Sequence, residues 1–101
     1  MDSGSELQSL RREIDEIDRQ LLALLARRMR LVLRVGDYKR EHEIPVYDPE
    51  RERAILDRLA AHAPSPLTAD SVKRVFERLI DESRRLEQHH MSGRESEPRS
   101  K

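Results

Sequence analysis

The sequence predicts an all-α protein with three helices per chain, of which the first is very long. Two observations support this prediction. Apolar residues recur at helical spacing through most of the chain, and proline-containing breaks near residues 42–48 and 63–66 divide the chain into three parts. No stretch shows the alternation of apolar and polar residues that is typical of a half-buried strand.

The first helix is predicted from about residue 6 to residue 41, a stretch with no proline and with Gly36 as its single glycine. At ~1.5 Å per residue, ~35 residues span more than ~50 Å, about twice the diameter of a compact domain of this size. Two short helices cannot cover an apolar face of that length, so a second copy of the chain is expected to cover the remainder. This apolar row, spaced alternately by three and four residues, comprises Leu7, Leu10, Ile14, Ile17, Leu21, Leu24, Leu31, Val35 and Tyr38.

The second and third helices are predicted from their start signals. Asp48 followed by Pro49 is typical of an N-cap with proline at the first helical position. After the second break, either Thr68 or Asp70 is expected to cap the third helix. We therefore predict a flexible leader over residues 1–5, one domain over residues 6–90 and a disordered tail over residues 91–101, which is rich in Ser and charge.

Composition narrows the possible functions. The chain has 101 residues, 36% hydrophobic and 40% charged, so a single copy would bury a thin core and oligomerisation is expected. Lys and Arg number 20 and Asp and Glu number 20, which argues against nucleic acid as the main partner. The chain has no cysteine, no apolar run near the ~20 residues of a membrane span and no signal peptide, so a cytoplasmic protein is expected.

A cation interrupts the apolar row of the first helix. The alternation of three and four that runs through Leu21 and Leu24 continues onto Arg28, and an arginine on a buried face needs a partner or an anion. Lys39 follows eleven residues later, close to three whole turns, so it projects from nearly the same face about ~16 Å away. These two cations can hold a small anion between them. Alternatively, Arg28 meets an acidic residue across a dimer and Lys39 is solvated, and the spacing leaves both interpretations open.

Polar residues on the other two helices admit two interpretations as well. Ser83 and Glu87 continue the inward positions of the third helix, either as ligand groups or as a helix end that emerges into water. Asp48, Arg51 and Glu52 fall in or next to the first turn of the second helix. Asp48 as an N-cap needs no further function, whereas Arg51 is unfavourable near the positive end of the helix dipole and mildly indicates a ligand.

Five segments follow one another within about residues 6–90. They are LRREIDEID at 10–18, LLALLARR at 21–28, VGDYK at 35–39, PVYDPERER at 45–53 and IDESRRLE at 80–87. In their order and gaps, these segments resemble the AroQ class of all-helical chorismate mutases, of the stand-alone bacterial type.

The resemblance implies an isomerase that rearranges chorismate to prephenate in aromatic amino-acid biosynthesis, with no cofactor and no metal. It also implies an intertwined antiparallel homodimer in which Arg11 enters the partner's site. The catalytic residues it implies are Arg28, Lys39 and Glu87, and the substrate-binding residues are Arg11, Asp48, Arg51, Glu52 and Ser83. In the family, the equivalents of Asp48 and Glu52 lie around the C4 hydroxyl of the substrate, and those of Arg51 and Ser83 lie near its ring carboxylate.

Glu87 departs from the bacterial members of the family, which commonly have glutamine at this position. An ionised glutamate cannot donate a hydrogen bond to the ether oxygen of chorismate. We therefore predict that burial raises the pKa of Glu87 and that activity favours mildly acidic pH.

Three other functions remain open from the sequence. One is a mutase of 4-amino-4-deoxychorismate, because Asp48, Glu52 and Glu87 would tolerate an ammonium group. Another is an isochorismate pyruvate lyase, although those enzymes lack the full block formed here by Asp48, Arg51 and Glu52. The third is a non-catalytic helical dimerisation module, which explains the apolar row but not Arg28.

Overall fold

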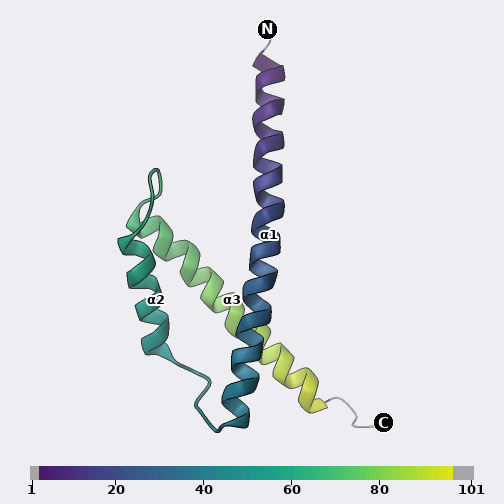
Figure 1. Cartoon of the computed structure of the whole chain (residues 1–101), viewed down its shortest axis with the longest axis vertical. Coiled ribbons are helices and arrows are strands. Elements are labelled where there is room, and N and C mark those ends of the chain that lie inside the picture. Colours follow the sequence, from purple (N-terminus) through teal and green to yellow (C-terminus); the bar gives the residue numbers. More distant parts are fainter. Residues whose placement is uncertain (1–2, 97–101) are drawn as a thin grey trace. The chain divides into compact units, whose positions relative to one another are not determined.

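A computed structural model describes residues 3–96 of the chain, and the side chains of residues 4–92. It contains three helices, α1 over Ser3–Glu41, α2 over Pro49–Ala61 and α3 over Ala69–Ser96, and the described residues include no strand. Figure 1 shows α1 as one long continuous helix. The prediction of an all-α fold with one very long helix is confirmed.

The chain divides into two units, Met1–Leu31 and Val32–Lys101. The first unit holds most of α1, and nearly all of its described side chains are exposed. The residues of the apolar row are exposed as well: Leu10 is 50% exposed, Ile14 56% and Leu24 57%. Within this unit, the chain therefore leaves the apolar face of its own helix uncovered.

The second unit holds the end of α1 together with α2 and α3. Helices α2 and α3 pack against each other and run in opposite directions (Figure 1). Val72 and Ile80 on α3 are the buried apolar residues among the described side chains, and Ser83 is the buried polar one. Such a small buried core agrees with the thin core that the composition predicts.

Side-chain caps start both shorter helices. The Asp48 carboxylate accepts a hydrogen bond from the backbone N–H of Arg51, and Pro49 follows it at the first helical position, as predicted. At the start of α3, the Thr68 hydroxyl accepts from the N–H of Ser71, and the Ser71 hydroxyl accepts from the N–H of Thr68. Thr68, one of the two predicted caps, is therefore the N-cap of α3.

The end of α1 turns the chain toward α2 through two backbone hydrogen bonds. The N–H of Ile44 donates to the carbonyl of Lys39 at 2.8 Å, and the N–H of Glu43 donates to the carbonyl of Arg40 at 3.3 Å. This is the Schellman pattern, which needs a left-handed residue just after the helix. Glu43 takes that position with φ of 57°, where glycine is usually found.

Helices α1 and α3 extend beyond the limits predicted for the domain, residues 6 and 90. Helix α1 begins at Ser3, within the predicted leader, and α3 continues to Ser96, within the predicted tail. Residues 1–2 and 97–101 lie outside the described residues, and the flexibility expected of both ends stays a prediction. Over the described helices, none is both long enough and apolar enough to cross a membrane.

Replacing Glu43 by glycine is expected to stabilise the fold. The substitution Glu43→Gly relieves the left-handed strain of a residue with a Cβ, and the free energy of unfolding should rise by about 0.5 to 1 kcal/mol. Urea unfolding at one fixed protein concentration measures this change. As a control, Glu41→Gly puts glycine inside the last turn of α1 and should lower stability by about 1 kcal/mol. Equal effects of the two variants would contradict the assignment of the cap.

Candidate active site

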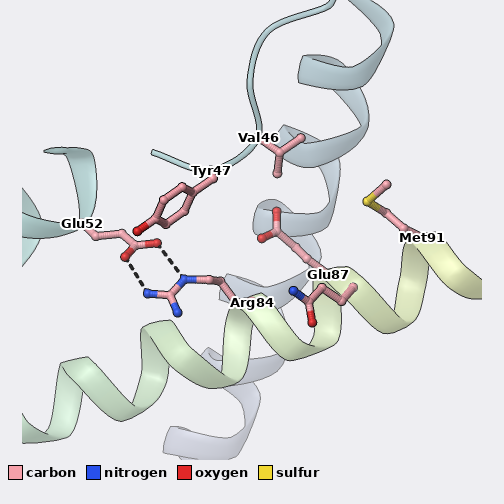
Figure 2. Close-up of a pocket in the computed structure, with 7 residues that line it drawn as sticks. Val46, Tyr47, Glu52, Arg84, Glu87 and Met91 are labelled. Carbon is pink, nitrogen blue, oxygen red and sulfur yellow. Dashed lines mark hydrogen bonds and ion pairs between the residues drawn. The ribbon is translucent and has the colours of Figure 1, made fainter. Parts of the chain in front are cut away.

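The second unit contains a pocket of about 490 Å³ between the segment before α2, α2 itself and α3. Figure 2 shows Glu52 and Arg84 facing each other across it, with Tyr47 and Glu87 beside them. The lining side chains are Val46, Tyr47, Glu52, Arg84, Glu87, Gln88 and Met91. Two of the predicted site residues, Glu52 and Glu87, thus lie in one pocket.

A two-point ion pair joins α2 to α3 in this pocket. Nε of Arg84 donates to Oε2 of Glu52 at 3.1 Å, and Nη2 donates to Oε1 at 2.7 Å. The Glu52 side chain is 24% exposed and the Arg84 side chain 41%. The hydrogen bond to Glu52 raises the pKa of the Arg84 guanidinium, so this group keeps its positive charge.

A second pair joins the end of α1 to the start of α2. Nζ of Lys39 lies 3.9 Å from Oδ2 of Asp48, and the Lys39 side chain is 21% exposed. The other carboxylate oxygen of Asp48, Oδ1, accepts the N–H of Arg51 at 3.1 Å. Asp48 therefore has two roles, since one oxygen begins α2 and the other faces the lysine.

Glu87 differs from the other two acids because it has no ion pair within 4 Å among the described residues. Burial raises the pKa of Glu87, against the lowering effects of the Arg40 and Lys39 cations. Arg40 is already engaged, with its Nη2 2.6 Å from Oδ1 of Asp37. Burial therefore outweighs the nearby cations, and Glu87 holds its proton to higher pH than an exposed glutamate would.

Gly36 on α1 makes room for the Glu87 carboxyl group. Gly36 is buried, and a Cβ at that position would lie 3.0 Å from Oε2 of Glu87. A contact this short requires the glutamate to move. The single glycine of the first helix is thus explained by close packing against α3 rather than by a kink.

The remaining predicted residues lie in different settings. Ser83 is buried, and its hydroxyl donates to the carbonyl of Leu79 at 2.8 Å. The Arg51 side chain is exposed, and only its backbone contributes to the cap. Arg11 and Arg28 both lie on the Met1–Leu31 part of α1, where Arg11 is exposed and Arg28 half-buried. The second unit thus brings together Lys39, Asp48, Glu52 and Glu87, and the two arginines belong to the first unit.

Sequence reasoning missed Arg84 and Tyr47. The guanidinium carbon of Arg84 lies 5.9 Å from the centre of the Tyr47 ring. One signal was present, because Arg84 precedes Glu87 by three residues and so lies on the same side of α3. The partner of Arg84 lies on another helix, however, and no spacing along the sequence identifies it.

Comparison with known sequences identifies the family of this chain. A profile of the family described as chorismate mutase type II matches residues 10–88. The chain belongs to this family. The resemblance of the sequence to the all-helical chorismate mutases is therefore confirmed at the level of the family.

Relatives in the chorismate mutase family include short and long proteins. The chorismate mutase of Methanocaldococcus jannaschii is 32% identical over 87 residues, which cover 85% of this chain and 88% of that protein. The T-protein of Haemophilus influenzae is 44% identical over 79 residues, which cover 76% of this chain. The chain spans only about a fifth (21%) of the length of that T-protein.

Solved chorismate mutase structures share the fold. One from Thermus thermophilus, in its form II, has a TM-score of 0.79 at 36% identity and covers 82% of this chain and 94% of its own. One from Helicobacter pylori, determined in complex with prephenate, has a TM-score of 0.79 at 31% identity and covers 87% and 96%.

Proposed function

We propose that this chain converts chorismate to prephenate as a cofactor-free isomerase, an intramolecular transferase. One observation carries the proposal. In a member of the chorismate mutase type II family, Lys39 and Glu87 lie in the same unit, with the lysine charge close enough to affect the pKa of the half-buried glutamate. That combination supplies a cation and an acid with a raised pKa, the two groups that suit an ether oxygen which gains negative charge.

The reaction requires little from the protein beyond position and charge. It is a pericyclic rearrangement in which a C–O bond breaks and a C–C bond forms within one molecule, with no proton transfer. The site must hold a flexible dianion in its compact conformer, which is catalysis by orientation. It must also stabilise the charge that develops on the ether oxygen, which fixed donors in a dry site do well.

The catalytic roles in this proposal are those that the family resemblance implies, and they meet these requirements. Lys39 donates to the ether oxygen and to a carboxylate of the substrate. Glu87, in its protonated form, donates a second hydrogen bond to the same oxygen. Arg28 binds a substrate carboxylate as a planar two-point donor, which accounts for a cation in the middle of an apolar row.

The binding roles belong to residues around the ring of the substrate. Asp48 and Glu52 accept from the C4 hydroxyl, while Arg51 and Ser83 lie near the ring carboxylate. The exposed side chain of Arg51 is then covered by the ligand and by the rest of the assembly. These roles rest on the family resemblance, and the grouping of Lys39, Asp48, Glu52 and Glu87 in one unit supports them.

The active form in this proposal is an intertwined antiparallel homodimer. The uncovered apolar row of α1 supports it, with Ile14, Ile17 and Leu24 each more than half exposed in the single chain. Arg11 and Arg28 are separated by seventeen residues of one helix, or about ~25 Å, too far to hold one small ligand together. In an antiparallel pair, Arg11 instead reaches the site of the second copy. We place this activity in aromatic amino-acid biosynthesis in the cytoplasm.

Removal of the Lys39 ammonium group tests the activity. The purified protein should consume chorismate and form prephenate, and Lys39→Ala should lower kcat/KM by about 100-fold or more. Lys73→Ala is the matched control, because Lys73 is 46% exposed, pairs with Asp57 and does not line the pocket. Assays with isochorismate and 4-amino-4-deoxychorismate run in parallel. Absence of turnover with all three substrates would contradict an enzymatic role.

Mixed dimers test the donation of Arg11. Inactive Arg11→Ala and Lys39→Ala proteins, unfolded and refolded together, form mixed dimers as half of the product, and one site in each is complete. About a quarter of wild-type activity should therefore return. A mixture of Arg28→Ala and Lys39→Ala serves as the control, since both residues act in the site of their own chain. Recovery in neither mixture would contradict the crossed arrangement.

The raised pKa of Glu87 predicts how activity depends on pH. In the proposal the protonated form is the active one, so activity is present below the pKa and is lost as pH rises through it. Between about pH 5 and about pH 8, kcat/KM of the wild type should therefore fall. Glu87→Gln, which donates a hydrogen bond at every pH, should remain active with a broader profile. A flat wild-type profile would rule out a titrating glutamate.

A further inference from the structure

The ion pair of Arg84 with Glu52 lines the pocket, although the sequence predicts only Glu52 as a site residue. Both oxygens of the carboxylate accept a hydrogen bond from one guanidinium, at 3.1 and 2.7 Å. Figure 2 shows the two bonds side by side beneath the Tyr47 ring. A two-point pair of this kind fixes the orientation of the carboxylate and compensates its charge.

The other acids of the site leave little free negative charge. Asp48 faces the Lys39 ammonium group at 3.9 Å. Burial raises the pKa of Glu87, so this group carries less charge than an exposed glutamate. The cluster therefore contains hydrogen-bond acceptors whose charges are compensated, rather than an uncompensated anion.

This distinction matters for the group that binds beside Glu52. A carboxylate offers about four acceptor positions, and Arg84 occupies two of them. A hydroxyl group can donate to one that remains. A primary ammonium group needs a net negative environment to offset its loss of hydration, and the adjacent guanidinium repels it.

We propose that Arg84 is a positioning residue that determines specificity: it holds Glu52 as a charge-compensated acceptor and thereby selects a substrate with a hydroxyl at C4 over one with an ammonium there. The inference rests on the proposed function, which places the C4 substituent beside Glu52. It also assigns a chemical reason for preferring chorismate to its 4-amino analogue.

A merely structural role for Arg84 predicts a different outcome. The pair links α2 to α3, so its loss alone would lower stability and would reduce turnover of both substrates alike. The ratio of the two kcat/KM values separates the roles, because a general loss of folded enzyme cancels in the ratio.

The test compares chorismate with 4-amino-4-deoxychorismate in the full-length protein. We expect the wild type to prefer chorismate, and Arg84→Met to shift the kcat/KM ratio toward the amino substrate by about tenfold. Arg85→Met is the matched control. The neighbouring Arg85 on the same helix is 71% exposed and pairs with Glu82, so its removal should leave the ratio unchanged.

Two further variants separate charge from geometry. Arg84→Gln removes the charge but keeps a hydrogen-bond donor, and it should shift the kcat/KM ratio in the same direction as Arg84→Met. This variant can replace Arg84→Met in the test if the methionine variant folds poorly. Arg84→Lys keeps the charge and should hold the ratio near that of the wild type. In a Glu52→Gln background, Arg84→Met should no longer change the ratio, because the residue acts through Glu52.

The outcomes that overturn the inference differ from those that overturn the function. Turnover of chorismate by the wild type, with a ratio unchanged in both Arg84→Met and Arg84→Gln, leaves the function standing and disproves the role of Arg84. A wild type that prefers the amino substrate also disproves that role. A wild type that converts neither substrate overturns the proposed function, and the inference with it.

Discussion

The length of α1 is the constraint on which the rest of the molecule depends. A helix of 39 residues extends about ~58 Å, and no helix of 13 or 28 residues can cover its apolar face from end to end. In the Met1–Leu31 unit, that face is exposed throughout the described residues. So much exposed apolar surface on one element favours association, and the covering surface in our proposal is the same helix of a second copy. In our proposal, catalysis by orientation needs no cofactor, so each helix of the assembly has to contribute only a few side chains to the site.

Charge compensation organises the second unit in a comparable way. Asp48 and Glu52 each have a cation within 4 Å. The pair of Asp48 with Lys39 joins the end of α1 to the start of α2, and the pair of Glu52 with Arg84 joins the first turn of α2 to the middle of α3. Both pairs form links where few apolar groups are buried among the described residues. Glu87 is the exception, and its setting is made by the absence of a side chain on Gly36 and by the engagement of Arg40 with Asp37. A carboxyl group with a raised pKa can donate a hydrogen bond up to higher pH than an exposed one, and the proposed reaction needs a donor at this point.

Local signals in the sequence predicted most of the fold. Apolar periodicity identified α1, and Asp48 with Pro49 and Thr68 identified the starts of α2 and α3, because caps act over three or four residues. The left-handed Glu43 gave no signal, since the Schellman turn usually has glycine there. For the candidate site, the sequence predicted Lys39, Asp48, Glu52 and Glu87, which the second unit brings together, but it did not predict Arg84, because its pairing with Glu52 depends on the packing of α3 against α2. Gly36 was noted as the single glycine of the first helix, whereas its closeness to Glu87 required the tertiary structure.

Arg28 shows how the proposed function costs stability. In a helix pair built only for association, the position between Leu24 and Leu31 would be apolar, and an arginine there must be desolvated on assembly. An anion that binds to it recovers part of that free energy, so ligand and assembly stabilise each other. In the proposed dimer, cations that weaken the empty assembly would become, once the dianion is bound, groups that hold it together.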